Sequence, residues 1–454
     1  MTAGSAVVAG AGSEATIYAP ATAVGRSALA VLRITGPRAA EAARALTGRA
    51  PPEPRRAALR RLRDPATGET VDEALLLWFP GPRSETGEDL LEVQHHGGQA
   101  VLAWLLEALG RLDGFRPAGP GEFTKRAFLN GKLDLTAAEG LADLVDAATR
   151  AQACQAFRQL AGELGRLYAG WRERLLTALA LVEAEIDFAA DGEEVPDATL
   201  ARVLPDLARI EAEMAAHLAD GARGERLRAG VTVAVVGAPN VGKSSLVNLL
   251  ARRDVAIVTP IPGTTRDVIE VHLDLGGVPV VLLDTAGLRE TGDPVEAEGV
   301  ARALSRAEQA DLRLHVVDAT DPAPSPPPDA MTLTVVNKID LVPYGVAGGA
   351  GGIGISCWTG TGLAELLREL TARAGALAGL GEAPLLTRAR HREAVAEARA
   401  SLARLQAGPD GGGGELALLA EDLRLAARAV GRLTGAVGVE EVLDRVFATF
   451  CIGK

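Results

Sequence analysis

Lysine, cysteine and aromatic residues are all scarce in this chain of 454 residues. Only five of its 47 basic residues are lysine, and its three cysteines lie far apart without metal-ligand spacing. Neither disulfides nor a zinc site is therefore expected. Aromatic residues make up 3% of the sequence, so the hydrophobic cores must be built mainly from alanine, leucine and valine.

Long apolar runs are absent as well. Charge or glycine interrupts each run well short of the roughly 20 residues that a membrane span needs, and the N-terminus lacks the basic region of a signal peptide. We expect a cytoplasmic protein without a membrane segment. The net charge of −12 repels phosphate, so nucleic acid would need a local patch. The arginine-rich residues 54–63 are a candidate, and a solvated loop or strand edge explains them equally well.

The spacing of apolar residues predicts several domains. Residues 1–135 mix short β-type runs with helical stretches, which indicates an α+β domain, whereas residues 136–228 show helical spacing alone. Residues 229–380 contain apolar runs that end in glycine or acidic residues, typical of buried, mostly parallel strands. Residues 381–454 are helical again. We expect the α/β unit to be inserted into one discontinuous helical domain, with two separate helical domains as the alternative.

A phosphate-binding loop is predicted at residues 237–244, GAPNVGKS, which follow a predicted strand and precede a helical segment. Its glycines allow a tight loop whose N–H groups surround phosphate, while Lys243 neutralises the β and γ oxygens and Ser244 ligates Mg²⁺. Asp284 ends a later strand and begins a DTAG sequence, a sensor of the γ-phosphate. Together these features predict a Ras-like P-loop domain.

The sequence NKID at residues 337–340 predicts guanine as the base. Asp340 can accept hydrogen bonds from the N1–H and 2-amino groups of guanine, a donor pair that adenine lacks. The predicted GTP-binding residues are Asn240, Val241, Gly242, Lys243, Ser244, Ser245, Thr259, Pro260, Ile261, Pro262, Gly263, Thr264, Thr265, Asp284, Thr285, Ala286, Gly287, Asn337, Lys338, Asp340, Ser356, Cys357 and Trp358.

Hydrolysis requires an arrangement different from that of Ras-type proteins, because the residue after DTAG is Leu288, which cannot orient water. Asn240 and the oxygen-rich residues 259–264 are candidates to hold a monovalent cation that neutralises phosphate charge. Glu296 either orients the attacking water through an intermediate or is an exposed helical glutamate. Thr265 is the expected switch threonine for the metal.

Several longer sequences carry a resemblance over nearly the whole chain. The GTPase motifs, GTTRD, DTAGLRE, LRITGP, TGEDLLEVQHHGG, GEFTKRAFLNGKLDL and the final CIGK resemble the MnmE (TrmE) family of tRNA uridine-modifying GTPases. The resemblance implies a K⁺-stimulated GTPase that forms a homodimer through its N-terminal domain and joins a flavin-dependent partner in a heterotetramer. The complex would modify carbon-5 of the tRNA wobble uridine with a 5-formyl- or methylene-tetrahydrofolate type one-carbon carrier.

The resemblance also implies individual roles. It assigns K⁺ to Asn240, Thr259, Ile261 and Thr264, Mg²⁺ to Ser244 and Thr265, catalysis to Glu296, and folate binding to Arg33, Glu92, Lys132 and Lys454. Cys451 is either a reactive thiol or a buried spectator. The residues SET at 84–86 depart from the family, which usually has an aromatic residue before TGED.

Two other functions fit part of the sequence. A ribosome-assembly GTPase of the Era-like group would share the nucleotide motifs, but such proteins usually add an RNA-binding module, and none is recognisable in the sequence. A GTP-dependent scaffold without catalysis would differ from an enzyme in its lack of turnover. His95 and His96 have no companion ligands in the sequence, so tight packing is expected there instead of a metal.

Overall fold

The computed structural model of the chain forms two compact units, residues 1–142 with 434–454, and residues 143–433. The described residues are 15–190, 198–253, 255–257, 270–284, 308–321, 331–343, 352–379, 386–406 and 413–437, with 443, 446–448, 450, 451 and 453. None of the helices in these ranges is both long and apolar enough to cross a membrane.

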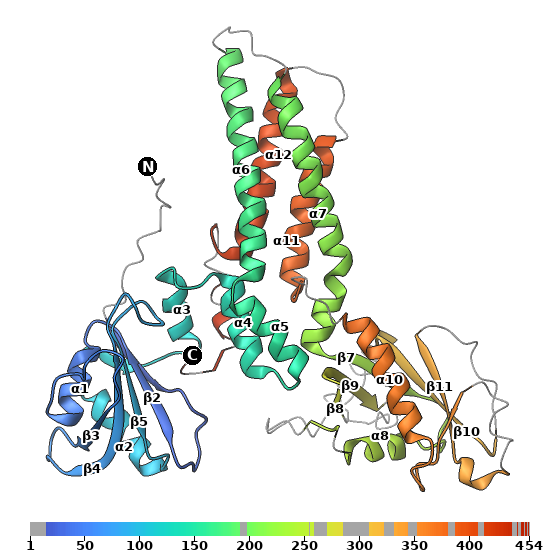
Figure 1. Ribbon diagram of the computed structural model, residues 1–454, viewed down its shortest axis with the longest axis horizontal. Helices are drawn as coiled ribbons and strands as arrows, with labels where there is room; N and C mark the ends of the chain where they lie inside the picture. Colours follow the sequence, from blue (N-terminus) through green and yellow to red (C-terminus); the bar gives the residue numbers. More distant parts are fainter. Residues whose placement is uncertain are drawn as a thin grey trace, which may run out of the picture. The chain divides into compact units, whose positions relative to one another are not determined.

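A mixed sheet covered by helices forms the main core of the first unit (Figure 1). The elements of this unit are β1 (Thr16–Pro20), β2 (Ala30–Thr35), α1 (Ala39–Thr47), β3 (Ala58–Arg63), β4 (Thr70–Phe79), β5 (Leu90–His95), α2 (Gln99–Gly110), β6 (Phe115–Pro117), α3 (Glu122–Leu129) and the greater part of α4 (Leu135–Asp146). The strand order is β3-β4-β5-β2-β1-β6, with β1 and β6 parallel and the other neighbours antiparallel. Leu46 of α1 and Leu105 of α2 share a core with Leu32 and Leu76 of the sheet.

The arginine-rich residues 54–63 include the edge strand β3, so the strand-edge alternative holds over residues 58–63. Arg61 pairs with Glu73 of β4 at 2.9 Å, and Leu62 points into the core. Charged side chains on an edge strand oppose pairing with the edge of a second sheet. This protection of the edge explains why arginines occur on β3.

The end of the chain packs on the first unit. Leu135 shares a hydrophobic cluster with Phe447 and Phe450. Gly453 has a φ of 98°, and a Cβ there would lie 2.1 Å from the Pro20 carbonyl oxygen. Because only glycine fits this close approach, a larger residue at position 453 could not lie against the end of β1 as Gly453 does.

A helical bundle occupies part of the second unit, and Figure 1 shows its long helices side by side. Its helices are α5 (Arg150–Leu160), α6 (Glu163–Ala190), α7 (Ala198–Ala229), α11 (Ala389–Gln406) and α12 (Gly413–Thr434). Trp171 of α6, Ile210 of α7, Val395 of α11 and Val430 of α12 belong to one hydrophobic core. Helices that precede and follow the second sheet in sequence therefore form a single bundle.

The second sheet is mostly parallel and lies between the two halves of this bundle in sequence. Its elements are β7 (Val231–Val236), α8 (Lys243–Ala251), β8 (Glu270–Leu275), β9 (Val278–Asp284), β10 (Leu312–Asp318), β11 (Thr332–Asn337), the 3₁₀ helix η2 (Ile339–Leu341), β12 (Ile353–Gly354) and α10 (Leu363–Ala378). The strand order is β12-β11-β10-β7-β9-β8, and only the β8–β9 pair is antiparallel among these described strands. The carboxyl ends of β7, β9, β10 and β11 meet at one edge, the usual place for a ligand in such a sheet.

Candidate functional site

The loop after β7 has the backbone of an anion-binding turn. Three of its residues have positive φ angles, 146° at Gly237, 63° at Asn240 and 101° at Gly242. A Cβ on Gly237 would lie 2.2 Å from the carbonyl oxygen of Val316, so the strand leads into the loop only with glycine there. Gly242 is the N-cap of α8, whose first N–H groups provide donors for an anion.

Lys243 is the first residue of α8 and lies inside the loop. Its side-chain ammonium donates to the carbonyl oxygens of Gly237 at 2.9 Å and Ala238 at 2.8 Å, and the residue is 9% exposed. An ammonium has three donors, so two hold it in the loop and the third suits a phosphate oxygen. Ser244 and Ser245 are exposed in the first turn of the same helix.

The Asn337 carboxamide connects three loops. Its Nδ2 donates to the Val241 carbonyl at 2.8 Å, and its Oδ1 accepts from the Cys357 N–H at 3.1 Å. Asn337 is 2% exposed, so a lost partner would leave a buried polar group unsatisfied. This side chain fixes the phosphate loop relative to the NKID and SCW sequences.

Lys338 makes a second connection to the phosphate loop. Its φ is 66°, and its ammonium donates to the Asn240 carbonyl at 3.0 Å and to Asp318 Oδ2 at 2.6 Å. Burial raises the pKa of Asp318, but hydrogen bonds from Lys338 and Thr320 outweigh this and lower it overall. Asp318 therefore stays ionised and holds the Lys338 stem beside the loop.

The predicted base-contacting residues lie around the end of β11. Asp340 is exposed on η2, Ser356 is buried, and Trp358 is 90% exposed. Burial, with a further contribution from the charge of Asp340, raises the pKa of Cys357 to about 11. The Cys357 thiol is therefore protonated at neutral pH and is no thiolate nucleophile.

Asp284 is the last residue of β9 and is 1% exposed. It lies opposite Val235 in the parallel pairing of β7 and β9, two residues before the phosphate loop begins. The carboxylate therefore occupies the same sheet edge as Lys243 and Ser244. The predicted site residues outside the described part of the chain are Thr259, Pro260, Ile261, Pro262, Gly263, Thr264, Thr265, Thr285, Ala286, Gly287, Glu296 and Lys454.

A second cluster of predicted residues lies in the first unit. Arg33 of β2 is opposite Glu92 of β5, with 3.2 Å between Nε and Oε1. The Arg33 guanidinium carbon lies 5.6 Å from the centroid of the Phe123 ring, within the range of a cation–π contact. Lys132 is exposed, and its Cε is 3.2 Å from where a Cβ on Gly87 would be.

The structure tests the predictions made for Cys451 and for the two neighbouring histidines. Cys451 is exposed, so the buried-spectator alternative is wrong; its carbonyl accepts from the Gly121 N–H at 3.4 Å. His95 is 1% exposed, with Nδ1 2.8 Å from the His96 carbonyl, which fits tight packing. The prediction is wrong for His96, which is exposed and has its Nδ1 2.6 Å from Asp72 Oδ1. No group of three possible metal-ligand side chains occurs among the described residues.

The sequence reasoning missed two charged residues at these sites. Asp318 follows a buried strand, as Asp284 does, and this shared position was the signal that could have found it. Glu85 contacts the Arg33 guanidinium from the loop between β4 and β5. The sequence departs from the family at residues 84–86, which drew attention to Glu85 but did not predict a role for it.

The loop after β7, the buried carboxylate of β9 and the NKID residues define a P-loop nucleotide-binding protein of the GTPase class. A family model described as "MnmE helical domain" matches residues 135–451, and one described as "GTP-binding protein TrmE N-terminus" matches residues 16–132. Proteins named tRNA modification GTPase MnmE are similar over nearly the whole chain. The one from Parvibaculum lavamentivorans is 56% identical over 97% of this chain and all of its own length.

The relative from Methylobacterium sp. (strain 4-46) is 54% identical over 97% of this chain and 99% of its own. The chain belongs to the MnmE family of tRNA modification GTPases. Among solved structures, the G domain of the T. maritima FeoB iron transporter is 27% identical over 32% of this chain and 98% of that chain, with a TM-score of 0.23. A score this low adds nothing to the argument.

The close approach at Gly242 gives a direct test of the nucleotide site. A Cβ on Gly242 would lie 2.2 Å from Asn337 Nδ2, and φ is 101° there, so Gly242→Ala must displace the buried carboxamide or the loop. We expect the affinity for GTP, measured by calorimetry, to fall at least about 100-fold.

Gly170→Ala is the matched control, because a Cβ at this position in α6 meets nothing within 4 Å. It should leave GTP affinity unchanged and stabilise the helix by roughly 0.5–1 kcal/mol. Equal GTP affinities in the Gly242→Ala variant and the unaltered protein would contradict the proposed phosphate site.

Proposed function

We propose that this chain couples GTP hydrolysis to modification of the tRNA wobble uridine at carbon-5, by carboxymethylaminomethyl or aminomethyl addition. Membership of the MnmE family supports the proposal. The observation that carries the nucleotide half is the Asn337 carboxamide, which joins the phosphate loop to the predicted base-binding loops. A phosphate site and a guanine site separated by one side chain suit a single GTP molecule.

Each predicted site residue would hold a different part of GTP or its metal. Lys243 and the N–H groups of the phosphate loop would hold the β and γ phosphates, while Asp340 would accept from the guanine edge. Ser244 and the switch residue Thr265 would ligate Mg²⁺, and the Asp284 carboxylate lies at the same sheet edge as Ser244. Bound there, Mg²⁺ neutralises charge that develops on the phosphates. Glu296 would orient the attacking water.

We propose K⁺ as a further activator, held by Asn240, Thr259, Ile261 and Thr264. Asn240 is the member of this set within the described residues. The Asn240 backbone is in the left-handed region, and its carbonyl accepts a hydrogen bond from Lys338. Its side chain is exposed at the surface of the phosphate loop. A cation beside this side chain would lie next to the phosphate oxygens, where it can stabilise the charge of the transition state.

Phosphate release from GTP should therefore be faster in K⁺ buffer than in Na⁺ buffer of equal ionic strength, by at least about ten-fold if the ion supplies 1.4 kcal/mol to the transition state. Steady-state assays with the purified chain measure this ratio. Glu296→Gln is the control, with GTP affinity retained and turnover low in both salts. Equal rates of the unaltered protein in the two salts would remove the K⁺ proposal.

We also propose that the first unit binds a tetrahydrofolate one-carbon carrier through Arg33, Glu92, Lys132 and Lys454. The described residues offer a guanidinium, a carboxylate acceptor and the Phe123 ring in one place. These groups suit a ligand that combines a planar pterin, N–H donors and carboxylates. The exposed Cys451 thiol lies in the same unit and is a candidate for a role in the reaction.

The partners follow from the same proposal. We propose a homodimer formed through the N-terminal domain, a flavin-dependent partner in a heterotetramer, and tRNA as the substrate. The cytoplasm is the proposed location, since GTP and tRNA meet there.

Cells that lack this protein should lose the carbon-5 modification of the wobble uridine, because no other step in the proposal supplies the group. Mass analysis of nucleosides from their tRNA tests this directly. Restoring the unaltered chain should restore the modification, and restoring the Gly242→Ala variant should not. Unchanged nucleosides in cells without the protein would sink the tRNA-modification proposal.

A further inference from the structure

A loop of the first unit, residues 84–89, brings a second carboxylate to Arg33. Glu85 contacts the Arg33 guanidinium, which is paired at the same time with Glu92 at 3.2 Å. The Arg33 side chain is 11% exposed and faces the Phe123 ring. One largely buried cation is therefore shared by two carboxylates.

The two carboxylates are held differently. Glu92 is part of the sheet, opposite Arg33 in the pairing of β2 with β5, and its side chain is 23% exposed. Glu85 comes from the loop, and its side chain is 46% exposed. A half-exposed carboxylate loses little by returning to water, so Glu85 is the partner of Arg33 that another acceptor can displace.

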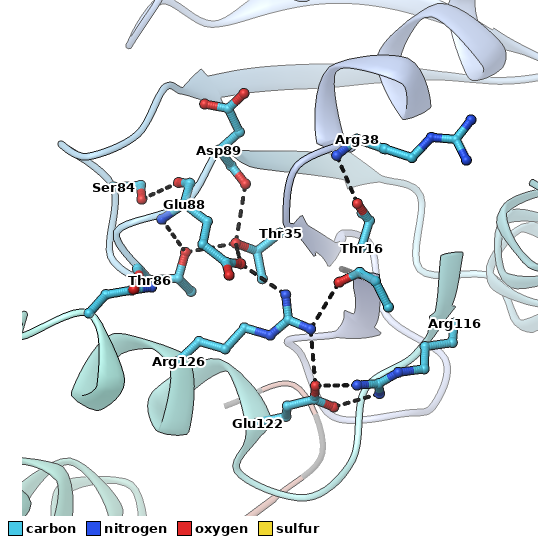
Figure 2. A network of polar contacts seen from close by, with 12 residues as sticks. Thr16, Thr35, Arg38, Ser84, Thr86, Glu88, Asp89, Arg116, Glu122 and Arg126 are labelled. Carbon is cyan, nitrogen blue, oxygen red and sulfur yellow. Dashed lines mark hydrogen bonds and ion pairs between the residues drawn. The ribbon is translucent and has the colours of Figure 1, made fainter. Parts of the chain in front are cut away.

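The loop around Glu85 is anchored by a polar network (Figure 2). The Thr86 hydroxyl lies 2.7 Å from the Thr35 hydroxyl, and the Thr86 carbonyl accepts from Asn130 Nδ2 at 2.7 Å. Two residues further along the loop, Glu88 accepts from Arg126 at 2.9 Å. Before Glu85, the Ser84 hydroxyl donates to the Glu88 carbonyl. Residues on both sides of Glu85 are therefore held, so its side chain can leave Arg33 without movement of the loop.

Arg126 is fixed in turn by α3 and its neighbours. It is 4% exposed and donates to Glu122 at 3.1 Å, while Arg116 donates to both oxygens of Glu122 at 2.8 and 2.6 Å (Figure 2). Burial raises the pKa of Glu122, but bonds from Arg116, the Gly119 N–H and Arg126 outweigh it and lower the pKa to about 2. The network therefore keeps its charges, and its hold on the loop, at neutral pH.

We propose that Glu85 is a tethered competitor at the folate site, whose carboxylate occupies Arg33 until an acceptor oxygen of the incoming ligand replaces it. Glu85 then sets the affinity of the site, and this inference rests on the proposed folate function. In the bound state the ligand oxygen takes the Arg33 donors, and the Glu85 side chain turns to solvent. A weaker competitor at residue 85 would make the same ligand bind more tightly.

The test is the affinity for 5-formyltetrahydrofolate, measured by calorimetry on the full chain. Glu85→Gln keeps the shape of the side chain and removes its charge, so we expect the Kd to fall about ten-fold, within the 5–150-fold range of typical couplings. Glu85→Ala removes the competing group altogether and should lower the Kd at least as much. Both substitutions replace the same half-exposed side chain, so the thermal stability of the protein should hardly change.

Glu73→Gln is the matched control, because Glu73 is a half-exposed glutamate of the same sheet that pairs with Arg61. It should leave the Kd unaltered. An unchanged Kd in both Glu85 variants would overturn the inference, and weaker binding would overturn it by making Glu85 a direct contact of the ligand. Absence of binding in every protein, the unaltered chain included, would instead refute the folate function and the inference with it.

Discussion

The nucleotide site depends on one buried side-chain amide, that of Asn337. Its two polar atoms bond to the backbone of the phosphate loop and to the backbone of the SCW sequence, which lie far apart in the chain. Gly242 must lack a Cβ because this amide fills the space beside it. The positions of Lys243 and of the predicted base-binding residues therefore depend on Asn337, which β11 places at the edge of the sheet.

The first unit is organised in a similar way by a buried cation. Arg126 bonds to Glu88 and Glu122, and these bonds join the loop at residues 84–89 to α3. The phosphate loop is held by the Asn337 amide and by the ammonium groups of Lys243 and Lys338, all bonded to its backbone carbonyls. The loop at residues 84–89 is held by an ion pair of its own side chain, Glu88 with Arg126, together with neutral bonds of Thr86. A charged network of low exposure gives a fixed frame on which an exposed side chain, Glu85, can exchange partners.

The sequence could predict the phosphate loop and the strand ends beside it, because their requirements are local. The glycines of GAPNVGKS signal positive φ angles, and buried strands before DTAG and NKID signal a shared sheet edge. The bonds of Lys338 to Asp318 and of Arg33 to Glu85 were not predicted, because they join residues 20 and 52 positions apart. Such contacts depend on strand register and loop path, which spacing alone does not determine. Most of the predicted switch residues lie outside the described part of the chain.

If Asp340 selects guanine in a site built around Asn337, an Asp340→Asn variant must change which nucleotide the chain prefers. A carboxamide can donate to the C2 carbonyl of xanthine, whereas a carboxylate can only accept from the 2-amino group of guanine. We expect the unaltered chain to bind GTP more tightly than xanthosine triphosphate and Asp340→Asn to reverse the order, each by at least about ten-fold in Kd. Since Asp340 is exposed, the fold should tolerate the change. An Asp340→Asn variant that still prefers GTP would contradict the account.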